Sequence, residues 1–349
     1  MNNEIIAKLT KCGEAASFSL WEKVRMRVIS YKNQCIDFLQ KPSPRPSPSG
    51  RGSFAIGSND KLKGFAYVLF AVIIWSGWTV ISRFAVKWNL SPYDVTAIRF
   101  TTAGIILLPV LIKKGFAISG HNVRDSLVMS LLMGAGFVNI ATMGMLFAPV
   151  SHISTTLNGT TAILTTIAGI FLLGERFSRS QFSGIVITVT GLVVIFTAKE
   201  ASAPDIHLGH ALFITAASMW AAYIYLVKKW KVEALHSAAI VSVFSMFYYM
   251  PFYLIFADKS HINIENWQPI LFQAFYQGVL TAILALFLFN KGLLIIGAAR
   301  AGAMIPLVPV LSTMLAVVIL QETPSFVELS GVLIVSIGVL LSSGILKKS

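Results

Sequence analysis

Ten apolar segments follow one another along the chain from residue 64 onward. They cover residues 64–83, 93–112, 126–147, 152–173, 181–198, 209–227, 236–257, 269–289, 298–320 and 327–346. A helix of about 20 apolar residues is long enough to cross the hydrocarbon core of a bilayer. The connections between the segments are short, which indicates one bundle rather than separate domains. The pattern therefore predicts an all-α polytopic membrane protein with ten transmembrane helices.

The second half of this pattern repeats the first half. Three residues recur at a spacing of 147 positions, as the pairs Glu175 and Glu322, Gly184 and Gly331, and Gly191 and Gly338. Five spans per repeat is an odd number, so the second repeat enters the membrane from the opposite side. Inverted repeats are typical of secondary transporters, in which the substrate binds between the two halves. We therefore predict two inverted five-helix repeats, at residues 64–200 and 207–346, that work by alternating access.

Residues 1–63 differ from everything that follows them. Positions 42–49 are rich in proline and serine and predict an extended or disordered linker. We predict that residues 1–63 are a basic N-terminal extension, largely disordered; the alternative is a basic amphipathic helix on an anionic membrane surface. No apolar stretch with the length of a signal-peptide core precedes residue 64, so the first span is expected to be the targeting signal.

The composition agrees with a protein that contacts the lipid bilayer. The chain is 55% hydrophobic and only 12% charged, whereas soluble domains carry about 25% charged residues. Its formal net charge of +13 does not indicate a nucleic-acid partner, because the basic residues lie between the apolar segments. With a cytoplasmic N-terminus, twelve Lys and Arg fall on inner connections and the C-terminal tail, and four on outer connections. This distribution predicts that both termini are cytoplasmic.

Several features are shared with a known family. They are Trp75 in the first span, Pro92 followed by Ala97-Ile98-Arg99-Phe100, Gly174-Glu175-Arg176 after the fourth span, and Pro306 followed by Leu320-Gln321-Glu322 in the second half. With the internal repeat, residues 64–346 resemble the EamA family of the drug/metabolite transporter superfamily. The resemblance implies a ten-helix permease of the bacterial inner membrane, often an exporter of amino acids, metabolites or drugs. The family usually has a proline inside the fourth span, where this chain has Asn158-Gly159-Thr160; Gly159 is a softer candidate for a helix break.

A polar seam runs along the fourth span. Its members are Ser151, Thr155, Asn158, Thr161 and Thr165, and their spacing places them on one helical face. Polar side chains inside a span face the bundle interior or a watery cavity. We predict that Asn158 faces the substrate, because an amide is costly to leave without partners in lipid. Thr155 is a second candidate, although threonines also serve for hydrogen bonds between helices.

Aromatic residues occupy equivalent places in the first and sixth spans. Trp75 and Trp78 match Trp220 and Tyr223 at a spacing of 145 positions. Trp75 and Trp220 lie too deep in their spans for the belt where Trp and Tyr anchor to headgroups. Trp75, Trp220 and Tyr223 are therefore candidates for the wall of a substrate site, where an aromatic face stacks on an apolar or cationic group. Packing within the core is the alternative.

Three further residues are candidates for substrate contact. Arg99 lies inside the second span, where a guanidinium serves as a handle for an anionic group or pairs near the membrane surface with Asp94. Gln277 of the eighth span shares a helical face with Gln273. Pro306 of the ninth span frees a backbone carbonyl one turn earlier, which occurs at substrate sites of transporters and also in simple kinks.

Other repeat-equivalent residues predict packing rather than substrate contact. Glu175 and Glu322 lie at span ends and are expected to cap the helices that follow them, as structural gates. The fifth and tenth spans carry stripes of small residues, at Gly184, Gly191, Gly331 and Gly338. Such stripes allow helices to approach closely in a membrane. A homodimer through the tenth span is an alternative use of the second stripe.

No motif of catalysis is present, and no cofactor is expected. His207 and His210, which we place in an outer loop, are a weak metal signal because further ligands are lacking nearby. All acidic residues lie outside the middle of the spans, so coupling needs an end-of-span group or the carrier is a facilitator. We predict a secondary transporter, not an enzyme, that exports small organic solutes. An importer of a nucleotide-like or cofactor-like metabolite, a lipid-modifying enzyme and a non-transporting scaffold are the alternatives.

Overall fold

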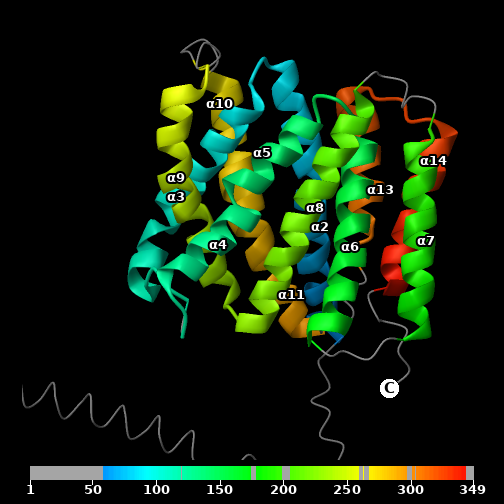
Figure 1. Cartoon of the computed structure of the whole chain (residues 1–349), viewed down its shortest axis with the longest axis horizontal. Helices are drawn as coiled ribbons and strands as arrows, with labels where there is room; N and C mark the ends of the chain where they lie inside the picture. The colour runs from blue at the N-terminus through cyan, green and yellow to red at the C-terminus, as the bar shows by residue number, and fades with distance from the viewer. Residues whose placement is uncertain are drawn as a thin grey trace, which may run out of the picture. The chain divides into compact units, whose positions relative to one another are not determined.

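The computed structural model describes residues 58–118, 120–173, 178–198, 205–258, 262, 267–296, 301–302 and 304–342 (Figure 1). Within these residues the main helices are α2 (Ser58–Lys87), α3 (Pro92–Lys114), α4 (Val123–Met133), α5 (Ala135–Gly144), α6 (Val150–Leu173), α7 (Arg179–Phe196), α8 (Ile206–Trp230), α9 (Ala234–Phe256), α10 (Trp267–Gln273), η3 (Ala274–Leu284), α11 (Ala285–Ile296), α13 (Leu307–Leu315), η4 (Ala316–Leu320) and α14 (Phe326–Ser342). The elements η3 and η4 are π-helical. The predictions for Glu175 and for residues 1–57 lie outside the described residues.

Apolar helices occupy all ten predicted spans. In the described chain, eight helical stretches are long and apolar enough to cross a membrane. The two that follow, Leu307–Leu320 and Phe326–Ser342, are apolar but shorter. Their order matches the ten apolar segments, and the prediction of an all-α polytopic membrane protein is confirmed.

The packing of the helices follows the repeat. Helix α2 of the first half packs against α11 and α13 of the second half, and its repeat equivalent α8 packs against α5 and α6 of the first half. Helix α3 packs against its own equivalent α9, and α7 packs against α14, on opposite sides of the bundle in Figure 1. Exchanging the two halves therefore preserves the pairing of helices, as expected for inverted repeats.

The spans break at places that the sequence indicated only in part. The third span divides at Gly134 between α4 and α5, where the hydroxyl of Ser245 from α9 occupies the space of a side chain. This hydroxyl also accepts a hydrogen bond from the backbone N–H of Ala135 (3.1 Å), which satisfies a donor at the start of α5. Helix α13 starts directly after Pro306. In contrast, α6 runs unbroken through Gly159, so the softer break is absent there.

Helices α7 and α14 approach closely along their glycines. A Cβ atom added to Gly184 would lie 2.7 Å from the carbonyl oxygen of Gly338, and one added to Gly338 would lie 2.9 Å from that of Gly184. A Cβ atom added to Gly331 would lie 3.2 Å from the carbonyl oxygen of Gly191. Side chains at these positions would collide with the facing backbone. The stripe of α14 is thus occupied by α7 of the same chain, and a homodimer would need another surface.

Candidate functional site

Arg99 of α3 is a buried cation at the contact between the two halves, with 9% of its surface exposed. Its Nη1 donates a hydrogen bond to Oε1 of Gln277 (3.2 Å). Its guanidinium carbon lies 5.9 Å from the ring centre of Trp78 and 5.7 Å from that of Phe100. Its Nε has no hydrogen-bond partner, and it forms no ion pair with any carboxylate of the described chain. A guanidinium without a counter-charge is costly to bury, so this position suits an anion that arrives with a ligand.

Asp94 does not pair with Arg99, contrary to one of the two predicted roles of the arginine. Its Oδ2 accepts hydrogen bonds from the backbone N–H (2.7 Å) and the hydroxyl (2.8 Å) of Ser91. Its Oδ1 accepts a hydrogen bond from the hydroxyl of Tyr253 (2.5 Å). The carboxylate completes a capping box at the start of α3, where a helix favours negative charge. Asp94 therefore stabilises the helix terminus and leaves the arginine unpaired.

Two glutamines of the eighth span connect Arg99 to α2. The amide nitrogen of Gln277 donates to the hydroxyl of Ser82 (2.8 Å) and to Oε1 of Gln273 (3.3 Å). The amide nitrogen of Gln273 donates to the carbonyl of Ile81 (2.9 Å). Both glutamines are fully buried and lie where α10 passes into the π-helical η3. Such turns often mark functional positions, and this one joins groups of both repeats around the arginine.

The aromatic residues do not contact one another in the pairs that the sequence repeat predicts. Trp78 stacks on Phe137 with ring centres 6.1 Å apart, and Phe137 contacts Trp220 at 6.2 Å. Trp75 lies elsewhere, with its ring centre 5.1 Å from that of Phe289, in a cluster that α2 forms with α11 and α13. Trp78, rather than Trp75, is therefore the tryptophan that joins Trp220 to the buried arginine.

Other predicted contact residues are bonded or buried within the bundle. Tyr223 shares a hydrogen bond with the hydroxyl of Ser237 (2.5 Å). Asn158 is buried and donates to the carbonyl of Ser154 in its own helix (2.7 Å). Thr155 is fully buried, and its hydroxyl has no hydrogen-bond partner among the described residues. Substrate contact by Asn158 and Thr155 stays a prediction.

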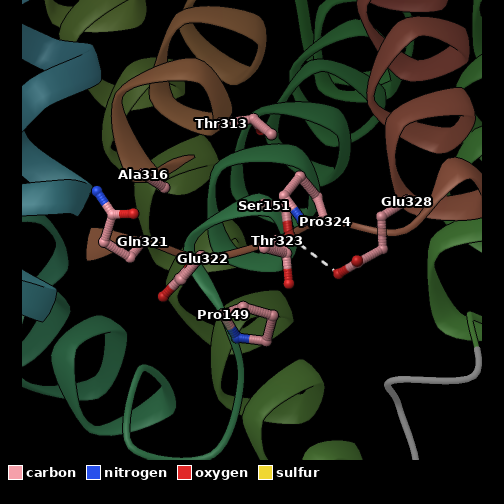
Figure 2. A pocket seen from close by; sticks show the side chains of 9 residues that line it. All are labelled: Pro149, Ser151, Thr313, Ala316, Gln321, Glu322, Thr323, Pro324 and Glu328. Carbon is pink, nitrogen blue, oxygen red and sulfur yellow. Dashed lines mark hydrogen bonds between the residues drawn. The ribbon is translucent and has the colours of Figure 1, made fainter. Parts of the chain in front are cut away.

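A pocket of about 290 Å³ lies at the end of the bundle where α6 and α14 begin (Figure 2). It is lined by Pro149, Ser151, Thr313, Ala316, Gln321, Glu322, Thr323, Pro324 and Glu328. The first two residues belong to the first repeat and the others to the second repeat. The pocket therefore lies at a junction of the two halves, and its volume is enough for several water molecules.

Glu322 lines this pocket and contacts the other repeat. Its Oε2 accepts a hydrogen bond from the backbone N–H of Val150, the first residue of α6 (3.1 Å), and its Oε1 lies 3.6 Å from Nε of Arg83. The helix that follows Glu322 is capped instead by Ser325 and Glu328. The prediction that Glu322 caps the following helix is therefore wrong. It caps α6 and ties the halves together at this end.

Sequence reasoning missed two residues beside the pocket. His152 and Glu328 are both buried, and Nε2 of His152 lies 2.7 Å from Oε1 of Glu328. The spacing of Ser325 and Glu328 is that of a capping box and was visible in the sequence. His210, which was predicted in a loop, is buried inside α8 and contacts His152.

Comparison with known proteins decides the family. A sequence model of the EamA-like transporter family matches the chain twice, over residues 62–197 and 207–344. The chain belongs to the EamA-like transporter family. A relative of this EamA-like transporter, the uncharacterized transporter YetK of Bacillus subtilis (strain 168), is 28% identical over 258 residues, which cover 71% of this chain and 77% of YetK. An uncharacterized transporter of Clostridium kluyveri is 23% identical over 313 residues, which cover 82% of this chain and 95% of that protein.

A solved crystal structure has the fold of this EamA-like transporter. The match has a TM-score of 0.54 and 18% sequence identity, and covers 83% of this chain and 96% of that chain. The predicted family resemblance is therefore confirmed, and the chain is a multi-pass membrane protein of a transporter family. The unpaired Arg99 and the end pocket both lie where the two halves of this protein meet.

Proposed function

We propose that this EamA-like transporter moves small organic solutes that carry a carboxylate group, such as amino acids or related metabolites. The observation that carries the proposal is the unpaired guanidinium of Arg99. A solute carboxylate supplies the missing counter-charge and accepts a hydrogen bond from its free Nε, in the planar geometry that arginine favours. Trp78 and Phe100 beside it offer apolar area for the remainder of the solute.

The mechanism proposed is alternating access between the inverted repeats. Arg99 belongs to the first repeat and its partner Gln277 to the second, so a solute bound there contacts both halves. At the end pocket, the contacts of Arg83 and Val150 with Glu322 hold the halves together. Release of these contacts would open that end of the bundle. The corresponding movement of the other repeat would close the opposite end.

The direction proposed is export across a bacterial inner membrane, with both termini in the cytoplasm. The excess of Lys and Arg on the connections that share a side with the termini supports this orientation. The EamA resemblance favours export of amino acids, metabolites or drugs. Import of a nucleotide-like or cofactor-like metabolite is the second candidate, because Arg99 with Trp78 also suits a planar anion.

Reconstitution tests this function directly. Purified protein in liposomes is expected to exchange a radiolabelled mixture of amino acids placed on both sides of the membrane at a rate well above that of empty liposomes. A competing series of unlabelled amines, carboxylic acids and nucleotides identifies the recognised group. Inhibition by carboxylates but not by amines supports the proposal. A rate equal to that of empty liposomes for every probe, with a lipid chemically modified instead, contradicts it.

Replacing Asn158 by leucine tests the polar seam of α6. The variant is expected to lose exchange by about fivefold to 150-fold if the amide contacts the solute, because a lost hydrogen bond in a buried site costs about 1–3 kcal/mol. Folding should persist, since the Asn158 amide donates its hydrogen bond to the carbonyl of Ser154 within the same helix. Thr190→Val, on an exposed face of α7, is the matched control. Full exchange by the Asn158 variant excludes this residue from the site.

A further inference from the structure

Three buried titratable side chains form a continuous chain beside the end pocket. Nε2 of His152 in α6 lies 2.7 Å from Oε1 of Glu328 in α14. Nδ1 of the same ring lies 2.7 Å from Nε2 of His210 in α8. The two rings are parallel within 1°. None of the three side chains is more than 5% exposed. The chain Glu328–His152–His210 therefore joins one residue of the first repeat to two of the second.

This chain keeps both hydrogen bonds at two different proton counts. With one proton on each ring, His210 donates from Nε2 to Nδ1 of His152, which donates from Nε2 to the carboxylate; the cluster then carries one negative charge. With one proton more, His152 is an imidazolium that donates to the carboxylate and to Nε2 of His210, whose own proton lies on Nδ1. The cluster is then neutral, and both hydrogen bonds between its members are kept.

A divalent metal does not fit these three residues. Glu328 and His210 approach opposite nitrogens of the same ring, so their donor atoms do not converge on one point. Within the described chain, no group of three His, Cys, Asp or Glu side chains is arranged to hold a metal ion. The arrangement resembles instead a hydrogen-bonded relay, in which histidine accepts and donates protons near physiological pH.

Water in the pocket can reach this relay. Glu328 and Ser151 both line the pocket, and the hydroxyl of Ser151 donates to Oε1 of Glu328 (3.1 Å), as Figure 2 shows. The Ser325 backbone N–H (2.8 Å) and hydroxyl (3.2 Å) donate to Oε2 of Glu328. These donors fix the position of the carboxylate at the start of α14.

Among the described residues, few other charged groups lie around this relay. Glu322, from the loop before α14, lines the same pocket, and its carboxylate pairs with Arg83 of α2. On α8, the ring of His207 lies 6.3 Å from that of His210, and Asp205 is exposed at the start of the helix. Phe196 of α7 covers His210 with ring centres 4.3 Å apart. Helix α13 and η4 offer only the neutral side chains of Thr313 and Ala316 to the pocket.

We propose that Glu328, His152 and His210 form a proton-binding site that couples solute transport to a proton gradient. This role rests on the proposed transport function. Contact between α6 and α14 gives His152 an anionic partner and favours the added proton, whereas separation of these helices removes that partner and returns the proton to water. Since proton binding and helix contact favour each other, a proton gradient drives the exchange between the two states. Export then occurs in exchange for entering protons.

Glu328→Gln tests the coupling in liposomes loaded with an acidic buffer. Wild-type protein is expected to accumulate radiolabelled amino acids inside, up to about tenfold for one proton per solute and a gradient of about one pH unit. Glu328→Gln is expected to lose this accumulation but to keep exchange at equal pH. The variant should fold, because Gln181 at the equivalent position already caps α7 through its Oε1, which accepts from the backbone N–H of Ser178 (3.0 Å).

A second variant and a control complete the transport measurement. His210→Gln leaves the cap of α14 untouched and is expected to lose accumulation in the same way. Asp125→Asn is the matched control, since Asp125 also completes a capping box and pairs with a histidine, His121, at 3.5 Å near the surface. It should accumulate like the wild type. Wild-type exchange that ignores the pH gradient, or full accumulation by Glu328→Gln, overturns the coupling. Absence of wild-type exchange contradicts the transport function instead.

Proton uptake tests the site without any solute. Purified protein in detergent is stepped from about pH 8 to about pH 6, and a pH dye reports the protons bound. Glu328→Gln is expected to bind about one proton fewer per chain than the wild type, because it lacks the carboxylate that is hydrogen-bonded to His152 in the proposed proton site. Asp125→Asn should bind about as many as the wild type. Equal uptake by Glu328→Gln and the wild type overturns the proton site, whatever the transport result.

Discussion

Replacing Gln277 by glutamate is expected to slow exchange of carboxylate solutes at least about tenfold without unfolding the protein. The new carboxylate would stand where Oε1 now lies 3.2 Å from Nη1 of Arg99. It would supply the counter-charge that the arginine lacks and so occupy the place proposed for the solute. Pairing a buried charge stabilises the fold, whereas competition within the chain reduces solute affinity by at least about tenfold. Exchange rates and melting temperature measure the two effects together.

The exchange rate and the melting temperature of Gln277→Glu together distinguish a solute-binding role of Arg99 from a purely structural role. If Arg99 serves only to hold helices together, Gln277→Glu strengthens that role and exchange continues at the wild-type rate, which contradicts the proposed carboxylate site. Gln181→Glu is the control for an added negative charge. Glutamate at this position keeps the capping box of α7, as Glu328 does for α14, and should leave exchange and melting temperature near the wild type.

The ten spans could be predicted because the bilayer imposes one length and one polarity on every helix. The repeat, with five spans in each copy, then predicts two inverted halves. The helix contacts agree with this prediction, because α2 packs against α11 and α13 as its equivalent α8 packs against α5 and α6. The break at Gly134 could not be predicted, since it depends on Ser245 of a helix far along the chain. Local sequence in the third span contains no proline to mark it.

The candidate site could be predicted as a set of residues but not as a set of contacts. Arg99 and Gln277 stood out singly, as polar groups inside apolar spans, yet their pairing joins residues 178 positions apart. Repeat alignment favoured Trp75 as the partner position of Trp220, but the packing of α2 turns Trp78 toward Phe137 instead. The spacing between the two repeats identifies which positions are equivalent. It does not determine which face of each helix points toward the interior of the bundle.

The relay at the end pocket was missed for a related reason. The sequence leaves an end-of-span group as a candidate for coupling but does not single out Glu328, which stands in the first turn of α14. Its capping box with Ser325 was visible, but this pattern alone predicts a helix start. The proximity of His152 adds the chemistry, and it depends on α6 lying against α14. A carboxylate at a span end is therefore buried when another helix of the bundle begins beside it.

Gly338→Val is expected to lower the melting temperature by roughly 2–5 °C, through overpacking that costs about 1–3 kcal/mol. Its Cβ would lie 2.5 Å from the backbone nitrogen of Thr188 and 2.9 Å from the carbonyl oxygen of Gly184, and neither backbone atom can rotate away. Helices α7 and α14 must therefore separate along their whole contact. Gly302→Ala is the control, because a Cβ there meets no atom within 4 Å. Size-exclusion chromatography after heating measures both variants. If Gly338→Val has the same melting temperature as the wild type, the close approach of α7 and α14 does not stabilise the bundle, and the glycine stripe is free for another partner.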